Sequence, residues 1–334
     1  MVYRPSWFKD DAIMVSTAPT CGLTKGGRLL PLVNASTGQR VQTEDPETGE
    51  LVDAVDDRLA IDMDALRAGT TTPTLRFVAR DDVSLRAAVP TFYDRRFDDA
   101  FDDAIRTVEF EEFESRSIGE LLSEGYLTVR HGHGSPTQSV RVGTVPYIKV
   151  SDLRAGLVNI NPTNRVPHSI AEGFWKAKTS GLQPWDLLSP ARTSKNIGDF
   201  CVLLPGQEEV VTTKEILVLR PGPNANFDPF YLIWAMTLNI VRNQWNRVVF
   251  MQTNREDVGD RYKEIRIPIP KARVVGERVS EPFRSYYRQL ADARGGLRKF
   301  LNTSEDHHFF LGTSDEAELE DVENDQALTS PIID

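Results

Sequence analysis

The chain lacks the features that identify disulfide-stabilised, zinc-binding, secreted and membrane proteins. Its 334 residues include two cysteines, Cys21 and Cys201, which lie far apart and predict neither a disulfide framework nor a zinc site. No apolar run approaches the roughly 20 residues of a membrane helix. The first residues do not follow the basic-then-apolar order of a secretory signal. We therefore expect a cytoplasmic protein without membrane contacts.

The sequence also lacks several catalytic motifs. It contains no Asp-x-Lys or Glu-x-Lys tripeptide, as metal-dependent nucleases need, and no phosphate-binding G-x-x-x-x-G-K-[S/T]. Residues 161–164, Asn-Pro-Thr-Asn, lack the second proline and the aromatic residue of an amino-methyltransferase motif and are typical of a turn. Residues 132–134, Gly-His-Gly, are followed by Pro136 where a cofactor-binding helix would start. His131 and His133 have no evident third metal ligand. We expect neither catalysis nor a metal or cofactor in this chain.

Charge is distributed unevenly. The net charge is −10, but residues 1–115 hold 13 Lys and Arg against 22 Asp and Glu, residues 116–304 hold 26 against 17, and residues 305–334 hold 0 against 10. A basic middle between two acidic ends favours contact of the middle with the phosphates of nucleic acid, whatever the charge of the whole chain.

Hydrophobic patterning near the N-terminus predicts a β-hairpin of residues 12–18 and 29–33, followed by a short helix at residues 62–67. Residues 97–108 carry Phe97, Phe101, Ile105 and Val108 at helical spacing, which predicts an amphipathic helix. The four aspartates of this helix are expected to form a solvated face: Asp98, Asp99, Asp102 and Asp103.

The middle of the chain alternates short β-type runs with polar loops, and residues 230–245 predict one long helix with a strand after it from Val248. Residues 280–303 predict a helix with Ser280 as N-cap, Pro282 in its first turn and a break at the glycines 295 and 296. Its apolar residues step by four and three in a heptad seam that suits the core or a partner. The residues of this seam that we predict to bind a partner are Val279, Phe283, Tyr286, Leu290, Leu297 and Phe300.

Several motifs of the middle resemble, in order, those of the specificity subunits of type I restriction–modification systems. They are I-G-E-L at residues 118–121, a Gly- and Ser-Pro-containing loop at 132–137 and V-P-Y-I-K-V-S-D-L-x-x-G at 145–156. L-Q-P-W-D-L-L at 182–188, D-P-F-Y-L-I-W-A-M at 228–236 and I-R-I-P-I-P at 265–270 follow. The resemblance covers about 190 residues and includes the helix after them. The family typically has two such halves, whereas this chain has one.

The N-terminal segment resembles the C-terminal tail of N6-adenine DNA methylase subunits of the same systems. That tail has a strand, a G-x-x-x-x-G turn, a second strand and an acidic D-D-x-L segment before a helix. The matching residues here are 13–15, 22–27, 29–32 and 56–59. A plain β-hairpin appendage is the alternative interpretation of this segment.

The resemblance implies an α+β fold: a target-recognition domain of mixed, barrel-like β-strands with packed helices, followed by a long C-terminal helix. It divides the chain into a methylase-tail-like appendage (1–70), a linker with an acidic helix (71–115), the recognition domain (116–270), a coiled-coil-like helix (273–303) and an acidic tail (304–334).

The function implied is that of a non-catalytic subunit which recognises a DNA sequence and directs a separate N6-adenine methyltransferase within a restriction or phage-defence system. The partners implied are double-stranded DNA, the methyltransferase subunit, a restriction or translocase subunit and a second copy of the chain. S-adenosylmethionine is expected only on the methyltransferase. The alternative is a protein-interaction or DNA-mimicking inhibitory module, whose acidic ends occupy the DNA channel of a partner.

Polar loops of the middle supply the candidate DNA contacts, because Arg pairs with guanine, Asn and Gln pair with adenine, and Lys suits phosphates. The candidates are His131, His133, Ser135, Thr137, Gln138, Lys149, Lys176, Lys178, Arg192, Thr193, Ser194, Lys195, Asn196, Arg247, Gln252, Asn254 and Arg255.

Overall fold

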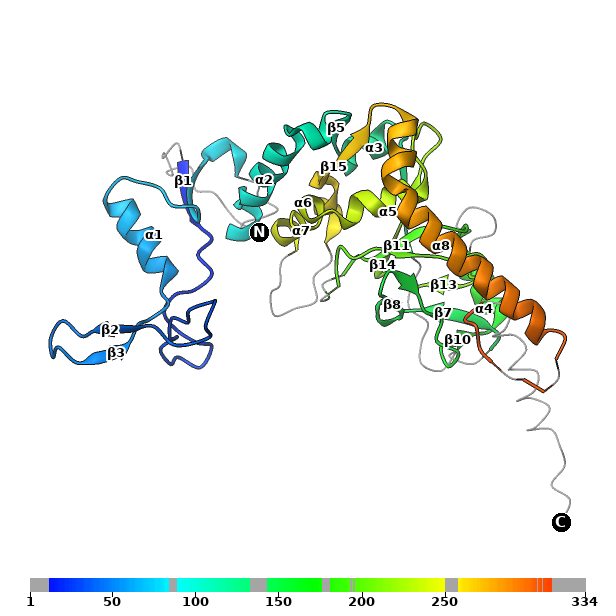
Figure 1. Ribbon diagram of the computed structural model, residues 1–334, viewed down its shortest axis with the longest axis horizontal. Coiled ribbons are helices and arrows are strands. Elements are labelled where there is room, and N and C mark those ends of the chain that lie inside the picture. Colours follow the sequence, from blue (N-terminus) through cyan, green and yellow to red (C-terminus); the bar gives the residue numbers. More distant parts are fainter. Residues whose placement is uncertain are drawn as a thin grey trace, which may run out of the picture. The chain divides into compact units, whose positions relative to one another are not determined.

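The structure, a computed structural model, describes residues 12–83, 89–132, 143–175, 181–192, 194, 196–249, 258–304, 306–307 and 309–313. The chain divides into two compact units, Met1–Arg96 and Phe97–Asp334 (Figure 1). Both units mix helices and strands, which confirms the α+β class. The described strands form several open sheets rather than a closed barrel.

The smaller unit is built on a long-range strand pair. β1 (Ala12–Ser16) lies antiparallel to β4 (Leu75–Ala79), and this pair buries Val15 and Val78 beside Tyr93. The predicted pairing of β1 with residues 29–33 is therefore wrong. Those residues make isolated bridges only, because Pro31 has no N–H for a ladder and Leu29 is 68% exposed.

A buried carboxylate joins the parts of this unit. α1 (Arg58–Arg67) carries Asp62, which is 1% exposed and accepts hydrogen bonds from the hydroxyls of Ser16 at 2.6 Å, Thr74 at 2.8 Å and Thr72. Burial raises the pKa of Asp62, but the three hydroxyl donors outweigh it and the pKa is lowered. The hairpin of β2 (Gln42–Glu44) and β3 (Leu51–Asp53) precedes α1.

The larger unit has a six-stranded sheet in the order β6-β14-β11-β12-β9-β8, a three-stranded sheet in the order β10-β7-β13 and the pair β5-β15. The bounds are β5 Phe113–Ser117, β6 Leu127–His131, β7 Val145–Ile148, β8 Leu153–Arg154, β9 Leu157–Val158, β10 Arg165–Val166, β11 Leu187–Pro190, β12 Cys201–Val202, β13 Val211–Thr212, β14 Ile216–Pro221 and β15 Arg266–Pro270. The short helices α3 (Ile118–Ser123) and α4 (His168–Trp175) belong to the same unit.

Three short helices occupy the place of the single long helix predicted at residues 230–245. They are α5 (Pro229–Thr237), α6 (Asn239–Arg242) and α7 (Trp245–Val248). The interruption lies at Leu238, whose ψ of 131° is extended. The resulting turns bury Val241, Trp245 and Val248 together in the main core. Val248 ends a helix, so the strand predicted to start there is not found.

α2 (Arg96–Ile105) is held to this core by buried charges. The side chain of Arg247 is 3% exposed, and its guanidinium lies 3.1 Å from the Asp98 carboxylate and 2.9 Å from that of Glu264. Arg266 lies 2.5 Å from Asp102. The solvated face predicted for this helix is therefore wrong for Asp98 and Asp102, because both pair with arginines that are distant in sequence.

α8 (Arg273–Leu301) is one continuous helix of 29 residues. The Ser280 hydroxyl donates to the Gly276 carbonyl at 2.8 Å inside the helix, so Ser280 is not the predicted N-cap. Pro282, Gly295 and Gly296 also lie within the helix, and the predicted break is absent. Packing against the rest of the unit outweighs the helix-weakening effect of these residues.

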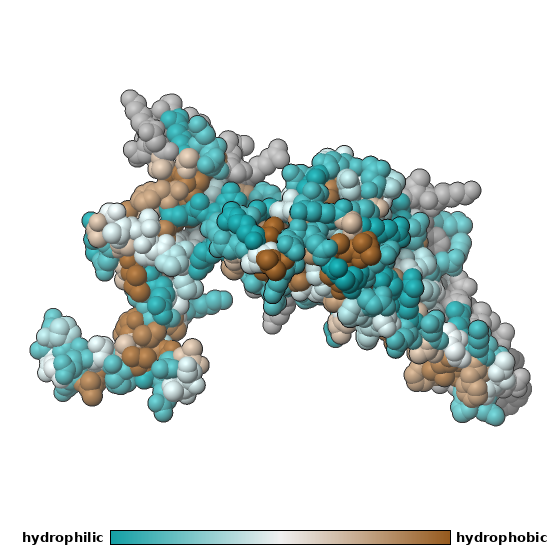
Figure 2. All heavy atoms as spheres, turned by 45° about the horizontal axis from the view of Figure 1, so that its top comes forward, coloured by the Kyte–Doolittle hydropathy of each residue, from teal (hydrophilic) through white to brown (hydrophobic). Residues whose placement is uncertain are grey.

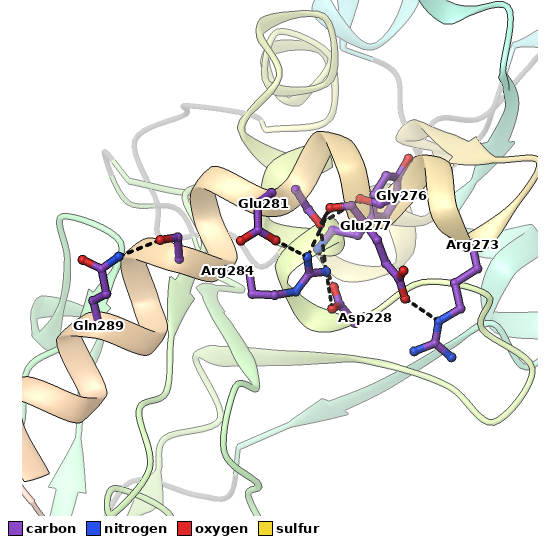
Figure 3. Close-up of polar contacts among 10 residues, drawn as sticks. Asp228, Arg273, Gly276, Glu277, Glu281, Arg284 and Gln289 are labelled. Carbon is purple, nitrogen blue, oxygen red and sulfur yellow. Dashed lines mark hydrogen bonds and ion pairs between the residues drawn. The ribbon is translucent and has the colours of Figure 1, made fainter.

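The first half of α8 packs on α5, as Figure 3 shows around Arg284. The Arg284 guanidinium lies 2.7 Å from Asp228, the N-cap of α5, and 2.8 Å from Glu281. Gly276 allows the close approach, because a Cβ there would lie 3.1 Å from Pro270 and 3.2 Å from Tyr231.

The predicted seam of α8 is divided between core and surface. Val279, Phe283 and Leu290 pack against the main core, while Tyr286, Leu297 and Phe300 are 53%, 41% and 52% exposed. Only the last three are thus open to a partner in this structure. No helix among the described residues is long and apolar enough to cross a membrane.

Replacing Arg247 by methionine should lower the free energy of unfolding by about 3–5 kcal/mol, because the buried Asp98 carboxylate would lose its cation. Urea denaturation measures this. Arg106→Gln, one residue past the end of α2, is the matched control: its pair with Asp103 is 75% and 79% exposed, and such pairs contribute about 0.2–1 kcal/mol. Equal losses in the two variants would contradict the assignment.

Candidate nucleic-acid interface

Three polar segments begin or end at one end of the six-stranded sheet. Residues 133–142 follow β6, residues 192–196 follow β11, and residues 250–257 precede Val258. Their stems are joined by main-chain hydrogen bonds near the start of β14. The Gly132 N–H donates to the Ile216 carbonyl at 2.9 Å, Ala191 to Glu215 at 2.7 Å, and Val258 to Ala191 at 2.9 Å.

The register of β14 explains this convergence. Its apolar run starts at Ile216 and is buried in the middle of the sheet, between β6 and β11. Leu217 lies opposite both His131 of β6 and Ser189 of β11. Directly opposed residues of antiparallel strands share one face of a sheet. The ends of β6 and β11 are thereby aligned, although about 60 residues separate them.

Gly132 is required by the close packing of one stem. A Cβ at this position would lie 1.8 Å from the carbonyl oxygen of Thr213. At a contact under 3.0 Å one of the two groups must move. Here the group that a Cβ would meet is a main-chain carbonyl, which cannot move aside as a flexible side chain can. Gly132 therefore has a structural role: it lets the main chain at the end of β6 pass close to the turn before β14.

The turn before β14 carries charges of both signs. Lys214 is exposed and, among the residues that the structure describes, has no carboxylate partner. Glu215 lies 2.8 Å from the Arg192 guanidinium, with both side chains about a quarter exposed. Arg192, predicted to read a base, is thus engaged by Glu215 in this structure and would have to exchange that partner to contact DNA.

Ser194 and Asn196 fasten their own loop. The Ser194 hydroxyl donates to the Asn196 side-chain oxygen at 2.8 Å, and the Asn196 amide donates to the Leu153 carbonyl at 3.0 Å. Both side chains are half-buried. Their polar atoms are used inside the protein, so the structure places them as supports of the loop rather than as free base contacts.

Lys149 and His131 differ in their surroundings. The Lys149 ammonium donates to the Asn164 side chain and lies over the Tyr147 ring, 5.5 Å from its centroid. Lys149 lies in the turn after β7. In the same turn, burial raises the pKa of the Asp152 carboxyl, although hydrogen bonds from the Lys149 backbone N–H and the Ser151 hydroxyl lower it in part. His131 is exposed at the end of β6, at the stem of the first loop.

The prediction for Arg247 is wrong, because its guanidinium is buried between carboxylates. The other candidates lie outside the described residues and stay predictions: His133, Ser135, Thr137, Gln138, Lys176, Lys178, Thr193, Lys195, Gln252, Asn254 and Arg255.

Lys214 was not among the residues predicted from sequence. The signal that points to it is the polar run Thr212, Thr213, Lys214, Glu215 between two buried β-type runs. Among the described residues, no cluster of three or more His, Cys, Asp or Glu is placed to hold a metal ion.

No known protein family model matches the chain, and no curated protein shows significant similarity to it. Solved structures do resemble it. An HsdS subunit from Thermoanaerobacter tengcongensis is 15% identical, with a TM-score of 0.36 over 70% of this chain and 51% of that one. The type I restriction–modification S subunit from M. genitalium is 12% identical, with a TM-score of 0.33 over 61% and 47%.

A third similar structure is the type IIG restriction endonuclease BpuSI, at 11% identity and a TM-score of 0.40 over 63% of this chain and 30% of that one. The chain spans about half the length of the first two solved structures that it matches. The two S subunits come from the family that the sequence motifs resemble.

Gly132→Ala should disrupt the stem of the first loop, because the new methyl group would collide with the Thr213 carbonyl. We expect a loss of several degrees in Tm, measured by calorimetry. Gly173→Ala is the control. It lies on α4 with nothing within 4 Å of its Cβ and should leave Tm unchanged or raise it slightly. An unperturbed Gly132→Ala variant would refute the packing argument.

Proposed function

We propose that this protein recognises a DNA sequence and directs a separate N6-adenine DNA methyltransferase to it. The observation that carries the proposal is that main-chain hydrogen bonds join the described stems of three polar segments near the start of β14: Gly132 and Ala191 donate to Ile216 and Glu215, and Val258 donates to Ala191. Loops held side by side on a rigid sheet can enter a groove together and read adjacent base pairs.

Charge supports DNA as the ligand. The net charge of residues 116–304 is +9, and this count does not depend on how individual side chains are paired. Lys214 supplies an exposed ammonium at the centre of the converging stems. Arg192 lies next to it with Glu215 as its partner. A phosphate near Lys214 would repel Glu215 and favour release of Arg192 toward a base.

Exposed apolar residues support a protein partner. On α8 these are Tyr286, Leu297 and Phe300, and the smaller unit shows brown patches on its surface in Figure 2. The methyltransferase and a second copy of the chain are the two candidate partners for α8. Sedimentation of the protein alone distinguishes them, because a second copy of the chain, unlike the methyltransferase, raises the sedimenting mass when no other protein is present.

The smaller unit also favours the second candidate function, a protein-interaction module. Its own core cluster consists of Val15, Val78 and Tyr93, while Leu29 and Leu51 are 68% and 71% exposed. A module of this kind would bind a DNA-processing partner without binding DNA. Absence of DNA binding at every salt concentration would select this function over the first.

Selection from a random duplex library by the full chain, with and without a methyltransferase, tests the preferred function. We expect one enriched sequence. Lys214→Gln should weaken binding to all sequences alike and reduce the slope of log K against log salt by about 1, as loss of one phosphate contact does. The control is Lys299→Gln in the last turn of α8, which should leave the slope unchanged.

Enrichment of no sequence under either condition would overturn the proposal. Equal salt slopes for wild type and Lys214→Gln would instead leave sequence recognition standing and remove Lys214 from the interface.

A further inference from the structure

Apolar side chains of the smaller unit are exposed where a core would be expected. Between Val15 and Leu75, a stretch that the structure describes in full, no hydrophobic side chain is buried. The same stretch holds nine of the sixteen large hydrophobic residues that are exposed among the described residues. Exposed apolar surface of this density marks an interaction site in a folded protein. The nine residues are Leu23, Leu29, Val33, Leu51, Val52, Val55, Leu59, Ile61 and Met63.

The hairpin of β2 and β3 is extended by a third, irregular strand. Residues 29–33 lie beside the stretch that continues β3. The Leu32 N–H donates to the Ala54 carbonyl at 2.7 Å, and the Asp56 N–H donates to the Leu30 carbonyl at 2.8 Å. The three segments therefore form one small sheet, although the third makes isolated bridges rather than a regular ladder.

The pairing places most of the exposed residues on one face of this small sheet. Directly opposed residues share a face, and so do alternate residues along one strand. One isolated bridge opposes Leu23 to Leu29, and another opposes Pro31 to Val55. Two further exposed residues are separated from these by intervals of two and four along their strands. We define the outer face by its apolar residues, which are Leu23, Leu29, Pro31, Val33, Leu51 and Val55.

The border of the outer face is acidic. Residues 42–53, which form the β2–β3 hairpin, include five Asp and Glu and no Lys or Arg. Arg40 lies 2.6 Å from Asp53 and pairs with one of the five carboxylates. An acidic border repels the phosphates of DNA and attracts a protein surface on which apolar side chains are accompanied by Lys and Arg.

The C-terminal half of α8 carries a surface of that kind. Four exposed residues follow one another at steps of seven, four and three, which places them on one side of the helix. Residues 293–304 include three Lys and Arg and no Asp or Glu. This side of α8 is therefore apolar and lies in a basic stretch. Its four residues are Tyr286, Ala293, Leu297 and Phe300.

A glycine lies on the same side of α8 without a packing reason among the described residues. Gly296 precedes Phe300 by four residues, so both lie on one side of the helix. A Cβ at Gly296 would have nothing within 4 Å, and its φ is not positive. Glycine weakens a helix relative to alanine, so the single chain gains nothing from it. The missing side chain leaves the main chain of α8 open to close approach by a partner.

We propose that the outer face of the smaller unit packs on this side of α8 in a second copy of the chain. Both surfaces are apolar, their charges are of opposite sign, and the same sequence supplies both. Each copy offers both surfaces, so two copies can make the contact twice and close a two-fold symmetric dimer. The inference goes beyond the proposed function, because the contact does not require DNA.

Sedimentation of the full chain over a range of concentrations tests the contact. We expect a dimer whose dissociation constant rises at least tenfold when Leu29→Gln and Leu51→Gln are combined. The two side chains are 68% and 71% exposed in the single chain, so the variant should keep its circular dichroism spectrum. Phe77→Gln is the control: Phe77 is 50% exposed on β4 of the same unit, outside the outer face, and should leave association unchanged.

Gly296→Gln tests the surface on α8. The new side chain has open space in the single chain and favours the helix, so the Tm of the monomer should be unchanged or higher. The dissociation constant of the dimer should nevertheless rise at least tenfold. Gly295→Gln is the matched control, because Gly295 also has nothing within 4 Å but points about 140° away from Phe300. It should leave association unchanged.

Cross-linking identifies the two surfaces directly. Cys21 is exposed two residues before Leu23, whereas Cys201 is buried. The wild-type chain is mixed with a differently tagged chain that carries Cys21→Ser and Ala293→Cys, and a bismaleimide is added. We expect a covalent dimer that contains both tags. Val274→Cys in place of Ala293→Cys is the control: Val274 is 68% exposed, about 28 Å away along the helix, and should give no such dimer.

A monomer at every concentration would overturn the contact, and so would a dimer whose affinity survives both the double leucine variant and Gly296→Gln. A cross-link that forms only within a chain carrying both cysteines would assign the two surfaces to one molecule and overturn the second copy. Association that requires added methyltransferase would assign the outer face to that protein instead.

The selection of DNA sequences is measured separately from these experiments. A monomer that still selects one sequence would overturn the dimer contact and leave the proposed function intact. A dimer with the expected variants and cross-link that selects no sequence would overturn the proposed function and leave the contact intact.

Discussion

Backbone hydrogen bonding at the start of β14 is the constraint on which the candidate site depends. The carbonyls of Glu215 and Ile216 accept from Ala191 and Gly132, and Ala191 in turn accepts from Val258. A buried main-chain group without a partner is costly, so this row holds the three stems together even though their sequences are unrelated.

A second constraint is the packing of α8 across the larger unit. Arg284 contacts the N-cap of α5, and the Tyr287 hydroxyl donates to the Gly156 carbonyl at 3.0 Å, in the turn between β8 and β9. The helix thus ties the core around α5 to the six-stranded sheet. This explains why part of an apparently continuous heptad seam is used internally and only its remaining residues are exposed.

Charge illustrates how far sequence reasoning reaches. The excess of basic residues in the middle segment is a property of composition, and folding cannot change it. Which individual arginines are available to contact DNA cannot be predicted in the same way. Three of them form ion pairs with aspartates that are distant in sequence: Arg247 with Asp98, Arg266 with Asp102 and Arg220 with Asp186. A basic residue in a polar stretch does not reveal its partner until the chain is folded, and Arg247 was predicted as a DNA contact for that reason.

Local patterns determined the mixed α and β class and the long C-terminal helix, since each depends on neighbours within a few residues. Tertiary structure alone decided the partner of β1, the interruption at Leu238 and the continuity of α8 through its glycines, because burial against distant residues outweighs local preference there. It also decided the site. Gly132, Ala191 and Lys214 carry no shared motif, and only the register of β14 with β6 and β11 brings them together.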